Sequence, residues 1–211
     1  MSGLSRRGFV VAGLGAGLLA GATTAAGAGG PGTTLREALE RRRSTRSYAQ
    51  TEIDDATLHA LLWSAIGVNR TESGGRTAPS WRTSYGIDVC VADRGGVRRY
   101  DPASASLGSV LADDVRGRAS PQPFVATAPA VLVYVADLAR MYAAPREEQV
   151  QAAHVDAGII AQNVYLFCAS AGLGTCLVGG ADRQGLAALL KLPDTQFVTF
   201  VQPVGHPSTN G

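Results

Sequence analysis

The chain has 211 residues, a length that suits one domain. Hydrophobic residues make up 45% of it and charged residues 17%, so the chain can build a core, which excludes an intrinsically disordered protein. Of the 19 basic and 17 acidic residues, two arginines and no acids fall within positions 1–28, so the remainder has a formal net charge of zero and gives no reason to expect a nucleic-acid partner.

The N-terminus has the layout of an export signal. A twin-arginine pattern at Ser5–Val11 leads into a glycine-softened apolar run, Val10–Ala22. Ala26–Ala28 then has the A-x-A form of a cleavage site. We therefore predict that residues 1–28 are a twin-arginine signal peptide and that the mature protein is periplasmic or extracellular. The apolar run is also long enough for an uncleaved anchor, so the pattern leaves that alternative open.

The first predicted helix begins a single domain at 34–211, after a flexible lead at 29–33. Thr34 and Glu37 form a capping box, and the helix that they open is expected to run to about Arg43. Its buried residues are expected to be Leu35, Ala38 and Leu39.

An arginine cluster, Arg41–Arg46, stands at the end of this helix. One interpretation is that cations favour a helix C-terminus. That interpretation does not account for Arg46, which lies beyond the helix. Arginines around hydroxyl groups also bind phosphate through bidentate charge-assisted hydrogen bonds, so the cluster is the first candidate anion site.

The second predicted helix begins at Asp54 or Asp55 and ends at Gly67. Its buried stripe is expected to comprise Leu58, Leu61, Leu62, Ala65 and Ile66, with Trp63 alongside. A polar loop, Val68–Tyr85, follows. A loop of this length in a compact domain is usually functional or disordered.

Four segments are predicted to be strands: Gly86–Ala92, Val97–Tyr100, Ala130–Ala136 and Gln196–Val204. The third is apolar throughout, which indicates a strand buried on both faces. The stretch Asp101–Arg118 is weakly patterned and receives no assignment.

The most conspicuous segment is a predicted helix at Gln149–Ala171, ended by Gly172. Its apolar residues go most of the way round, which indicates a buried helix. A small domain cannot easily cover a helix of this length, so we predict a homodimer built on it. Polar residues interrupt it too often for a membrane span. The next stretch, Leu173–Gly180, is read as a short buried strand with a closing glycine pair that lets the backbone approach a flat or bulky group.

A short helix capped by Asp182 precedes the last strand. Strands and helices do not alternate regularly, so the predicted class is α+β, a mixed sheet flanked by helices on both sides. Cys90, Cys168 and Cys176 each lie in an apolar context, which favours buried free thiols over an oxidised pair. The histidines are isolated and the cysteines lack metal-ligand spacing, so we predict no metal site.

Five motifs in this order resemble the FMN-dependent nitroreductase superfamily. They are Arg42–Arg46, Arg76–Ser80, Asp156–Asn163, Gly172–Thr175 and Gln202–Pro207. The branch that the chain resembles most contains the azoline dehydrogenases, which act on peptide heterocycles. The resemblance covers nearly all of the chain after the signal, and it implies a nitroreductase-like fold with the long helix at a dimer interface.

The resemblance also implies a cofactor site for FMN. Arg42, Ser44 and Arg46 are expected to bind the FMN phosphate, with Arg43 in the same site. The residues expected along the isoalloxazine ring are Pro79, Ser80, Thr83, Val178, Gly179 and Gly180, with a backbone N–H of the glycine segment near flavin N5. No side chain is required as a catalytic acid or base, because the flavin carries the chemistry.

Three features depart from the family's pattern. Thr83 and Tyr85 stand where relatives often have Asn and Gln, and Gly179 stands where many have an acidic residue. Relatives often add a second basic group near the C-terminus, whereas only Lys191 is basic after Arg183. The expected function is therefore an exported FMN-dependent oxidoreductase acting on a small-molecule or peptide-derived substrate. The alternatives are a non-catalytic or degenerate flavin-binding dimer and a plain structural domain.

Overall fold

The computed structural model describes residues 32–208. At its centre is a six-stranded sheet with the strand order β5-β4-β3-β6-β8-β7. The strands are β3 (Ile87–Asp93), β4 (Gly96–Asp101), β5 (Ser106–Leu111), β6 (Ala130–Asp137), β7 (Gly174–Thr175) and β8 (Gln196–Gly205). Their pairings are antiparallel, and parallel pairing is confined to an isolated bridge between Ser44 and Thr175. The mixed character of the sheet is thus limited to its β7 edge.

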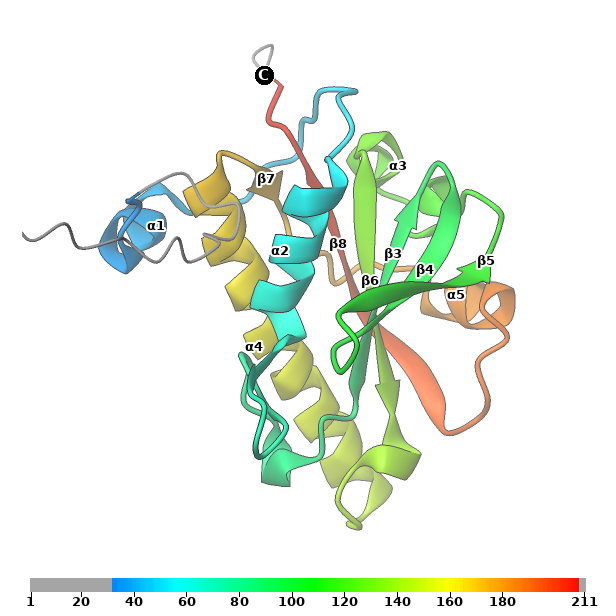
Figure 1. Cartoon of the computed structure of the whole chain (residues 1–211). Coiled ribbons are helices and arrows are strands. Elements are labelled where there is room, and N and C mark those ends of the chain that lie inside the picture. Colours follow the sequence, from blue (N-terminus) through cyan, green and yellow to red (C-terminus); the bar gives the residue numbers. More distant parts are fainter. Residues whose placement is uncertain (1–31, 209–211) are drawn as a thin grey trace, which may run out of the picture.

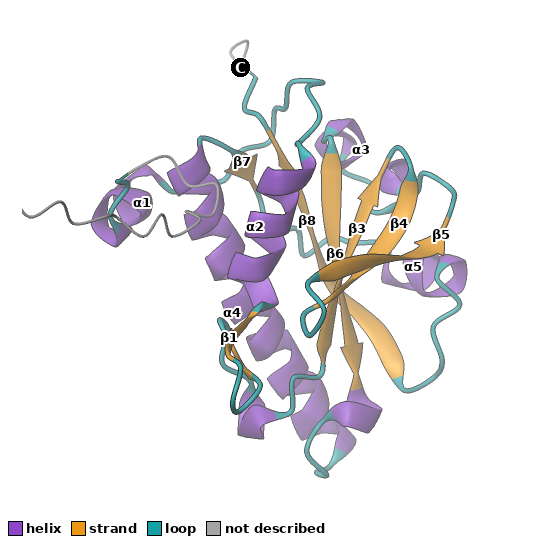
Figure 2. Cartoon of the chain, in the orientation of Figure 1, coloured by secondary structure: helices purple, strands orange, loops and turns teal. Residues whose placement is uncertain are grey.

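Helices cover both faces of this sheet, as predicted (Figures 1 and 2). The α-helices are α1 (Leu35–Arg41), α2 (Asp55–Ile66), α3 (Pro123–Thr127), α4 (Arg146–Ala171) and α5 (Arg183–Leu189). On one face α2 and α4 lie side by side over a core that contains Leu61, Leu132 and Ile160. On the other face α3 and α5 cover a second core around Val125 and Leu186. The predicted α+β class with helices on both sides is confirmed.

The first helix has the predicted capping box, but two of its residues that were predicted to be buried are exposed. The Thr34 hydroxyl accepts a hydrogen bond from the Glu37 N–H, and the Glu37 carboxylate accepts one from the Thr34 N–H. The helix ends at Arg41, with Arg42 as its C-cap. Leu35 and Leu39 are 65% and 51% exposed, so the prediction that they are buried is wrong for the single chain. Since α1 lies beside the end of α4 and away from the sheet, the described part of one copy leaves both side chains largely uncovered.

The second helix matches its prediction, with Asp54 as N-cap, Gly67 as C-cap and the expected five residues buried. The segment Val68–Tyr85, predicted to be a loop, contains some regular secondary structure. It contains a small two-stranded sheet of β1 (Val68–Arg70) and β2 (Gly75–Arg76), and then the 3-10 turn η1 (Trp81–Thr83). Strands of two or three residues are too short to produce a readable alternation.

The predicted strands correspond to β3, β4, β6 and β8 within one or two residues. The interpretation that the Ala130–Ala136 stretch is buried on both faces is confirmed. The sequence missed β5, α3 and the 3-10 turns η2 (Arg116–Arg118) and η3 (Leu138–Arg140). The strand β5 could not be predicted because it lies at the edge of the sheet. Most of its residues are exposed there, so its sequence needs no apolar alternation.

The long helix α4 begins three residues before the predicted start and ends at Ala171 as predicted. Gly172 caps it in the left-handed region at φ 71°. Its burial is one-sided in the single chain: Ala153, Ala157 and Val164 are fully buried, whereas Val155 is 56% exposed. All three cysteines are buried free thiols, as predicted. Within residues 32–208 no helix is long and apolar enough to cross a membrane. The signal, its cleavage site and most of the lead lie outside the described residues.

Candidate functional site

The arginine cluster leaves α1 as extended chain and is fixed to the β7 edge of the sheet. Arg42, the C-cap, has φ −53° and ψ 123°, which ends the helix. The Thr45 N–H then donates to the Thr175 carbonyl at 2.9 Å, next to the parallel bridge between Ser44 and Thr175. Tyr48 adds a second anchor, because its hydroxyl donates to the Thr45 carbonyl at 2.6 Å. Burial raises the pKa of Tyr48, so this donor keeps its proton.

Tyr165 of α4 links this cluster to the glycine segment that follows β7. The Tyr165 hydroxyl lies 3.0 Å from the Ser44 hydroxyl and accepts the Leu177 N–H at 2.8 Å. Its ring stacks with the Arg42 guanidinium, 5.3 Å from the ring centroid. Two segments far apart in the sequence are therefore held on the same side of α4.

A hollow of about 160 Å³ lies at this junction. Arg41, Arg42 and Arg43 line it together with Tyr165 and Thr175. Within residues 32–208 no carboxylate forms an ion pair with these three arginines or with Arg46. Their positive charge is available to an anion, and guanidinium groups match the geometry of phosphate oxygens.

The glycine segment Val178–Gly180 is held by its carbonyl groups. Val178 pairs with Val201 of β8 and is buried. The Gly179 carbonyl accepts from the Arg183 guanidinium at 2.9 Å, and the Gly180 carbonyl accepts from the Ser120 hydroxyl at 2.8 Å. The N–H groups of both glycines make no hydrogen bond within the described part of the chain, and both residues are exposed. Two fixed, unpaired donors next to an arginine cluster suit a ligand that is polar at its edge and anionic at its end.

The loop after β2 is held by a different residue, the buried Asp156 of α4, which is 3% exposed. The Ser80 hydroxyl donates to this carboxylate at 2.6 Å, and the Trp81 N–H donates to it at 3.0 Å. The Ser80 hydroxyl also accepts the Tyr85 N–H at 2.9 Å. A carboxylate buried in an apolar helix needs such donors, and here they fix the course of the loop.

The backbone of this loop is strained. Arg82, Thr83 and Tyr85 have φ values of 48°, 54° and 48°, a region that residues with side chains rarely adopt. The Thr83 hydroxyl donates to the Arg82 carbonyl at 2.7 Å. Arg76 stacks over the Tyr85 ring at 4.7 Å, and burial lowers the pKa of its guanidinium.

The predicted site residues therefore fall into two groups. The arginine half comprises Arg42–Arg46 and Val178–Gly180, which meet through Tyr165. The loop half comprises Pro79–Tyr85, which includes the predicted Pro79, Ser80 and Thr83 and is anchored on Asp156. Because Asp156 and Tyr165 are nine positions apart on one helix, they point to opposite sides of α4 and lie about 14 Å apart along its axis. A single chain does not bring the two halves together.

Four residues that shape these halves were absent from the predicted site: Tyr165, Asp156, Arg183 and Ser120. The sequence contained a signal for one of them, because an acidic residue inside an apolar helix requires buried partners. The roles of Arg183 and Ser120 depend on how β8 and the segment before α3 pack against the glycines, which no local pattern shows.

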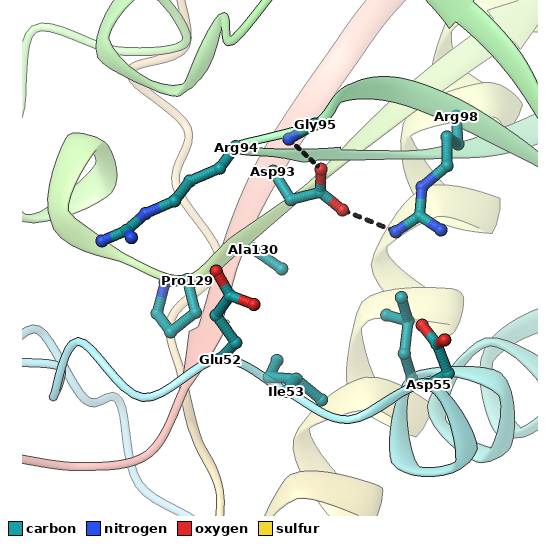
Figure 3. Close-up of a pocket in the computed structure, with 10 residues that line it drawn as sticks. Glu52, Ile53, Asp55, Asp93, Arg94, Gly95, Arg98, Pro129 and Ala130 are labelled. Carbon is teal, nitrogen blue, oxygen red and sulfur yellow. Dashed lines mark hydrogen bonds and ion pairs between the residues drawn. The ribbon is translucent and has the colours of Figure 1, made fainter.

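A separate hollow of about 160 Å³ lies between the start of α2 and the β3–β4 turn (Figure 3). Its charged groups partly pair with one another: the Asp93 carboxylate accepts from Arg98 at 2.6 Å and from the Gly95 N–H at 2.8 Å. No predicted site residue lines it. Within residues 32–208 no group of three or more potential metal ligands is found.

Comparisons with known proteins show the family of this chain. The model of the Nitroreductase family matches residues 39–206. A protein of Methanocaldococcus jannaschii that is named as a nitroreductase is 32% identical over 182 residues, which is 82% of this chain and 90% of the relative.

Solved structures extend the likeness. A crystal structure from Ralstonia eutropha, described as a nitroreductase, has a TM-score of 0.81 and 39% identity, covering 85% of each chain. The Escherichia coli microcin synthetase McbBCD complex with truncated pro-MccB17 has a TM-score of 0.72 and 20% identity, covering 80% of this chain and 70% of that one. The NADPH:FMN oxidoreductase of Vibrio harveyi, complexed with NAD⁺, has a TM-score of 0.64 and 23% identity, covering 83% of this chain and 70% of that one. The last two are similar in fold alone.

Proposed function

The chain belongs to the nitroreductase family of oxidoreductases, and from that premise we propose that it is an exported FMN-dependent oxidoreductase. The observation that carries the proposal is the arginine half. There, guanidinium groups without an ion pair and backbone N–H groups without a hydrogen bond, both within the described residues, are held on one side of α4. These residues fit FMN, because the arginines suit its phosphate and the N–H groups suit the polar edge of its ring. When bound, FMN supplies two-electron hydride transfer through N5.

The chain's own residues bind the cofactor and orient its ring. Arg42, Ser44 and Arg46 hold the phosphate, with Arg43 contributing charge from the wall of the hollow. The N–H groups of Gly179 and Gly180 donate to the ring edge near N5. Arg183 holds the Gly179 carbonyl and so the peptide group that carries the Gly180 N–H, and the Val201 N–H, 3.4 Å from the Val178 carbonyl, holds the peptide group that carries the Gly179 N–H. Preorganised donors of this kind cost no reorganisation when charge develops on the acceptor.

We further propose that the site is completed by a second copy of the chain. In one copy Pro79 and Ser80 lie on the side of α4 opposite the arginine half, so they reach a ring there only from a partner. A hollow of about 440 Å³ between α1, α2 and α4 is lined by Leu35, Trp63 and Phe167, which gives the partner an apolar surface to cover. An obligate interface of this kind buries on the order of 2,000 Å² or more.

A non-catalytic flavin-binding dimer is the second candidate, and two observations favour it. The Thr83 hydroxyl turns back to the Arg82 carbonyl and does not replace an amide aimed at a ring. Lys191 follows α5, on the sheet face away from α4, so it supplies no second cation to the arginine half. Bleaching of the protein's colour by a reductant, followed by reoxidation by an added acceptor, distinguishes an enzyme from a passive carrier.

The test of cofactor binding is direct. We expect the purified protein to be yellow and to release FMN on denaturation. The Arg46→Ala variant should purify with little FMN and remain folded. The control Arg36→Ala alters an exposed arginine that pairs with Glu40, one helical turn away, and this variant should keep its FMN. Unchanged FMN binding by Arg46→Ala would refute the phosphate assignment.

Export has its own test. A twin-arginine signal suits a protein that folds around a cofactor before it crosses the membrane, which links the proposed localisation to the proposed flavin. Replacing Arg6 and Arg7 by lysine should trap a folded, flavin-loaded protein inside the cell. Normal export of that variant would remove this part of the proposal. The substrate class proposed from the azoline dehydrogenase branch is a small or peptide-derived molecule.

A further inference from the structure

The loop half presents an arginine between two aromatic rings. The Arg82 guanidinium lies 4.3 Å from the centroid of the Tyr142 ring and 5.7 Å from that of the Trp81 ring. The two rings meet edge to face, with centroids 5.7 Å apart. We call Trp81, Arg82 and Tyr142 the Arg82 stack. A guanidinium stacked on rings keeps its N–H donors in its own plane, free at the edge.

Nothing in the described chain neutralises this arginine. Arg82 is exposed and forms no ion pair within residues 32–208. By contrast, Arg140, close by in the sequence to Tyr142, pairs with Asp88 at 2.7 Å and Asp137 at 3.3 Å. The Arg82 guanidinium is therefore held in place by the two rings, but no carboxylate of the described chain pairs with it.

The stack is held in place by the strained backbone described above. Arg82 itself is in the left-handed region, and it is kept there because Asp156 fixes the residues before it. On the other side, the Tyr142 N–H donates to the Ser84 hydroxyl at 2.9 Å, which ties the second ring to the same loop. Backbone strain that is overdetermined by its surroundings is a feature of ligand sites.

An open hollow of about 290 Å³ adjoins the stack. Trp81 forms one wall, and Ala152 and Val155 of α4 supply apolar surface, with Gln151 and Glu148 as the polar lining. The apolar wall suits a flat ring. Glu148 is the one carboxylate among the lining residues, so an anionic group in this hollow is repelled from that end of α4. Arg82 does not line the hollow itself, but its guanidinium lies 5.7 Å from the centroid of the Trp81 ring that does, so it is the neighbouring cation that attracts the anion.

We propose that the Arg82 stack recognises the substrate of the proposed flavin site, and that it selects planar conjugated molecules carrying a carboxylate. The ring of such a molecule packs on Trp81 and the apolar wall, and its carboxylate bonds the edge of the Arg82 guanidinium. The inference rests on the proposed function, because Pro79 and Ser80, proposed to lie beside the flavin ring, directly precede Trp81.

The test compares two probes of nearly equal shape, 2-naphthoate and 2-naphthamide, by titration calorimetry with the purified protein. We expect 2-naphthoate to bind at least about tenfold more tightly than the neutral amide, as a charge-assisted bidentate pair predicts. Arg82→Gln should weaken 2-naphthoate binding about tenfold and change 2-naphthamide binding less than about twofold.

Three further variants sharpen the result. Arg82→Lys keeps the charge without the planar fork and should fall between the parent and Arg82→Gln. Glu148→Gln removes the repelling carboxylate and should tighten 2-naphthoate binding about two- to threefold. The matched control is Arg146→Gln. Arg146 is also exposed and forms no ion pair within residues 32–208, but it lies at the start of α4, outside the stack and the lining of the hollow. It should change neither affinity.

Equal affinities for the two probes, no binding of either probe, or an equal loss of both in Arg82→Gln would overturn the inference. Thermal melts of each variant show that it is folded. The flavin absorbance of the same preparations separates the two claims. A protein that holds FMN but shows no preference for the anion refutes the Arg82 stack alone. A protein without FMN refutes the proposed function, while a tenfold preference for 2-naphthoate in it still supports recognition by Arg82.

Discussion

The arginine half and the loop half flank the same helix but are held in opposite ways. Beside the arginine half the unusual backbone conformation falls on a glycine, Gly172 at φ 71°, which lines the same hollow, and main-chain pairing with β7 sets the course of the arginine cluster. In the loop half such conformations fall on Arg82, Thr83 and Tyr85, and one buried carboxylate holds the segment. The arginine half is relaxed and is held by main-chain pairing and hydroxyl groups, whereas the loop half is strained and depends on a buried carboxylate 76 positions from Ser80.

The difference shows what each half contributes. The arginine half, which is unstrained and held by main-chain hydrogen bonds, suits a tightly bound phosphate group, because a phosphate needs donors in fixed positions. A strained loop suits the contact that selects substrate, because strain is retained only where the surrounding structure enforces it. Single substitutions can disrupt one half at a time.

The largest effect is expected from Asp156→Ala. This change leaves the Trp81 N–H and the Ser80 hydroxyl without their buried acceptor, so the free energy of unfolding should fall by about 3 kcal/mol. Urea denaturation measures the loss. Glu148→Gln, on the exposed side of the same helix, should stay within about 0.5 kcal/mol of the parent. A small loss in Asp156→Ala would show that the loop is held by other contacts.

The next effect belongs to the arginine half. Arg46→Ala should weaken FMN binding by about tenfold to a hundredfold, which corresponds to about 1.5–3 kcal/mol for a hydrogen bond to a charged group. The free energy of unfolding without FMN should change little, because Arg46 is exposed. Fluorescence titration with FMN measures the affinity. A variant that is destabilised but binds FMN normally would mean that Arg46 has a structural role.

Tyr165→Phe should have a smaller effect, on both the free energy of unfolding and the affinity for FMN. It removes the acceptor for the Leu177 N–H and the contact with the Ser44 hydroxyl, so we expect a loss of about 1–2 kcal/mol in stability and weaker FMN retention. Thermal melts with and without added FMN report the two losses. If stability falls while FMN affinity is unchanged, the link between the arginine cluster and the glycine segment does not matter for binding.

The smallest effect is expected in the loop half, with the opposite sign. Thr83 is exposed, and its hydroxyl bonds only the neighbouring Arg82 carbonyl. Thr83→Gly removes left-handed strain of about 1–2 kcal/mol. The greater freedom of glycine in the unfolded chain offsets about 0.5–1 kcal/mol of that gain, so the free energy of unfolding should rise by up to about 1.5 kcal/mol. The control Thr77→Gly, at a position without positive φ, should lower it. A destabilised Thr83→Gly would contradict the strain assigned to this loop.

The same contrast explains what the sequence revealed. The caps at Thr34, Asp54 and Gly172 were predictable because each depends on neighbouring residues. The buried strand β6 was predictable because its apolar run is continuous. The strand β5 was not, since an exposed edge strand needs no alternation. The residues of the two halves could be named from family motifs, but their separation by α4 could not, because it depends on the direction in which each helical side chain points.

The exposed Leu35 and Leu39 show a second limit of predicting burial from the sequence. The apolar pattern of α1 predicted burial, and in one copy of the chain that prediction is wrong. The pattern of α2 leaves a second such residue, because Trp63 is 46% exposed and lines the same hollow as Leu35. Exposed apolar residues of this kind are expected if a sequence encodes a surface that only a second copy buries.

The central claim is that one flavin site takes its arginine half from one protomer and its loop half from the partner. Mixed dimers test it most directly, with Arg46→Ala on one differently tagged protomer and Ser80→Ala on the other. Each mutant homodimer should bind FMN weakly. If the halves come from different protomers, the mixed dimer has one site with both changes and one with neither, so it should bind one FMN per dimer with the parent's affinity. If both halves of a site come from the same chain, each site in the mixed dimer carries one change, and no binding at the parent's affinity will be recovered.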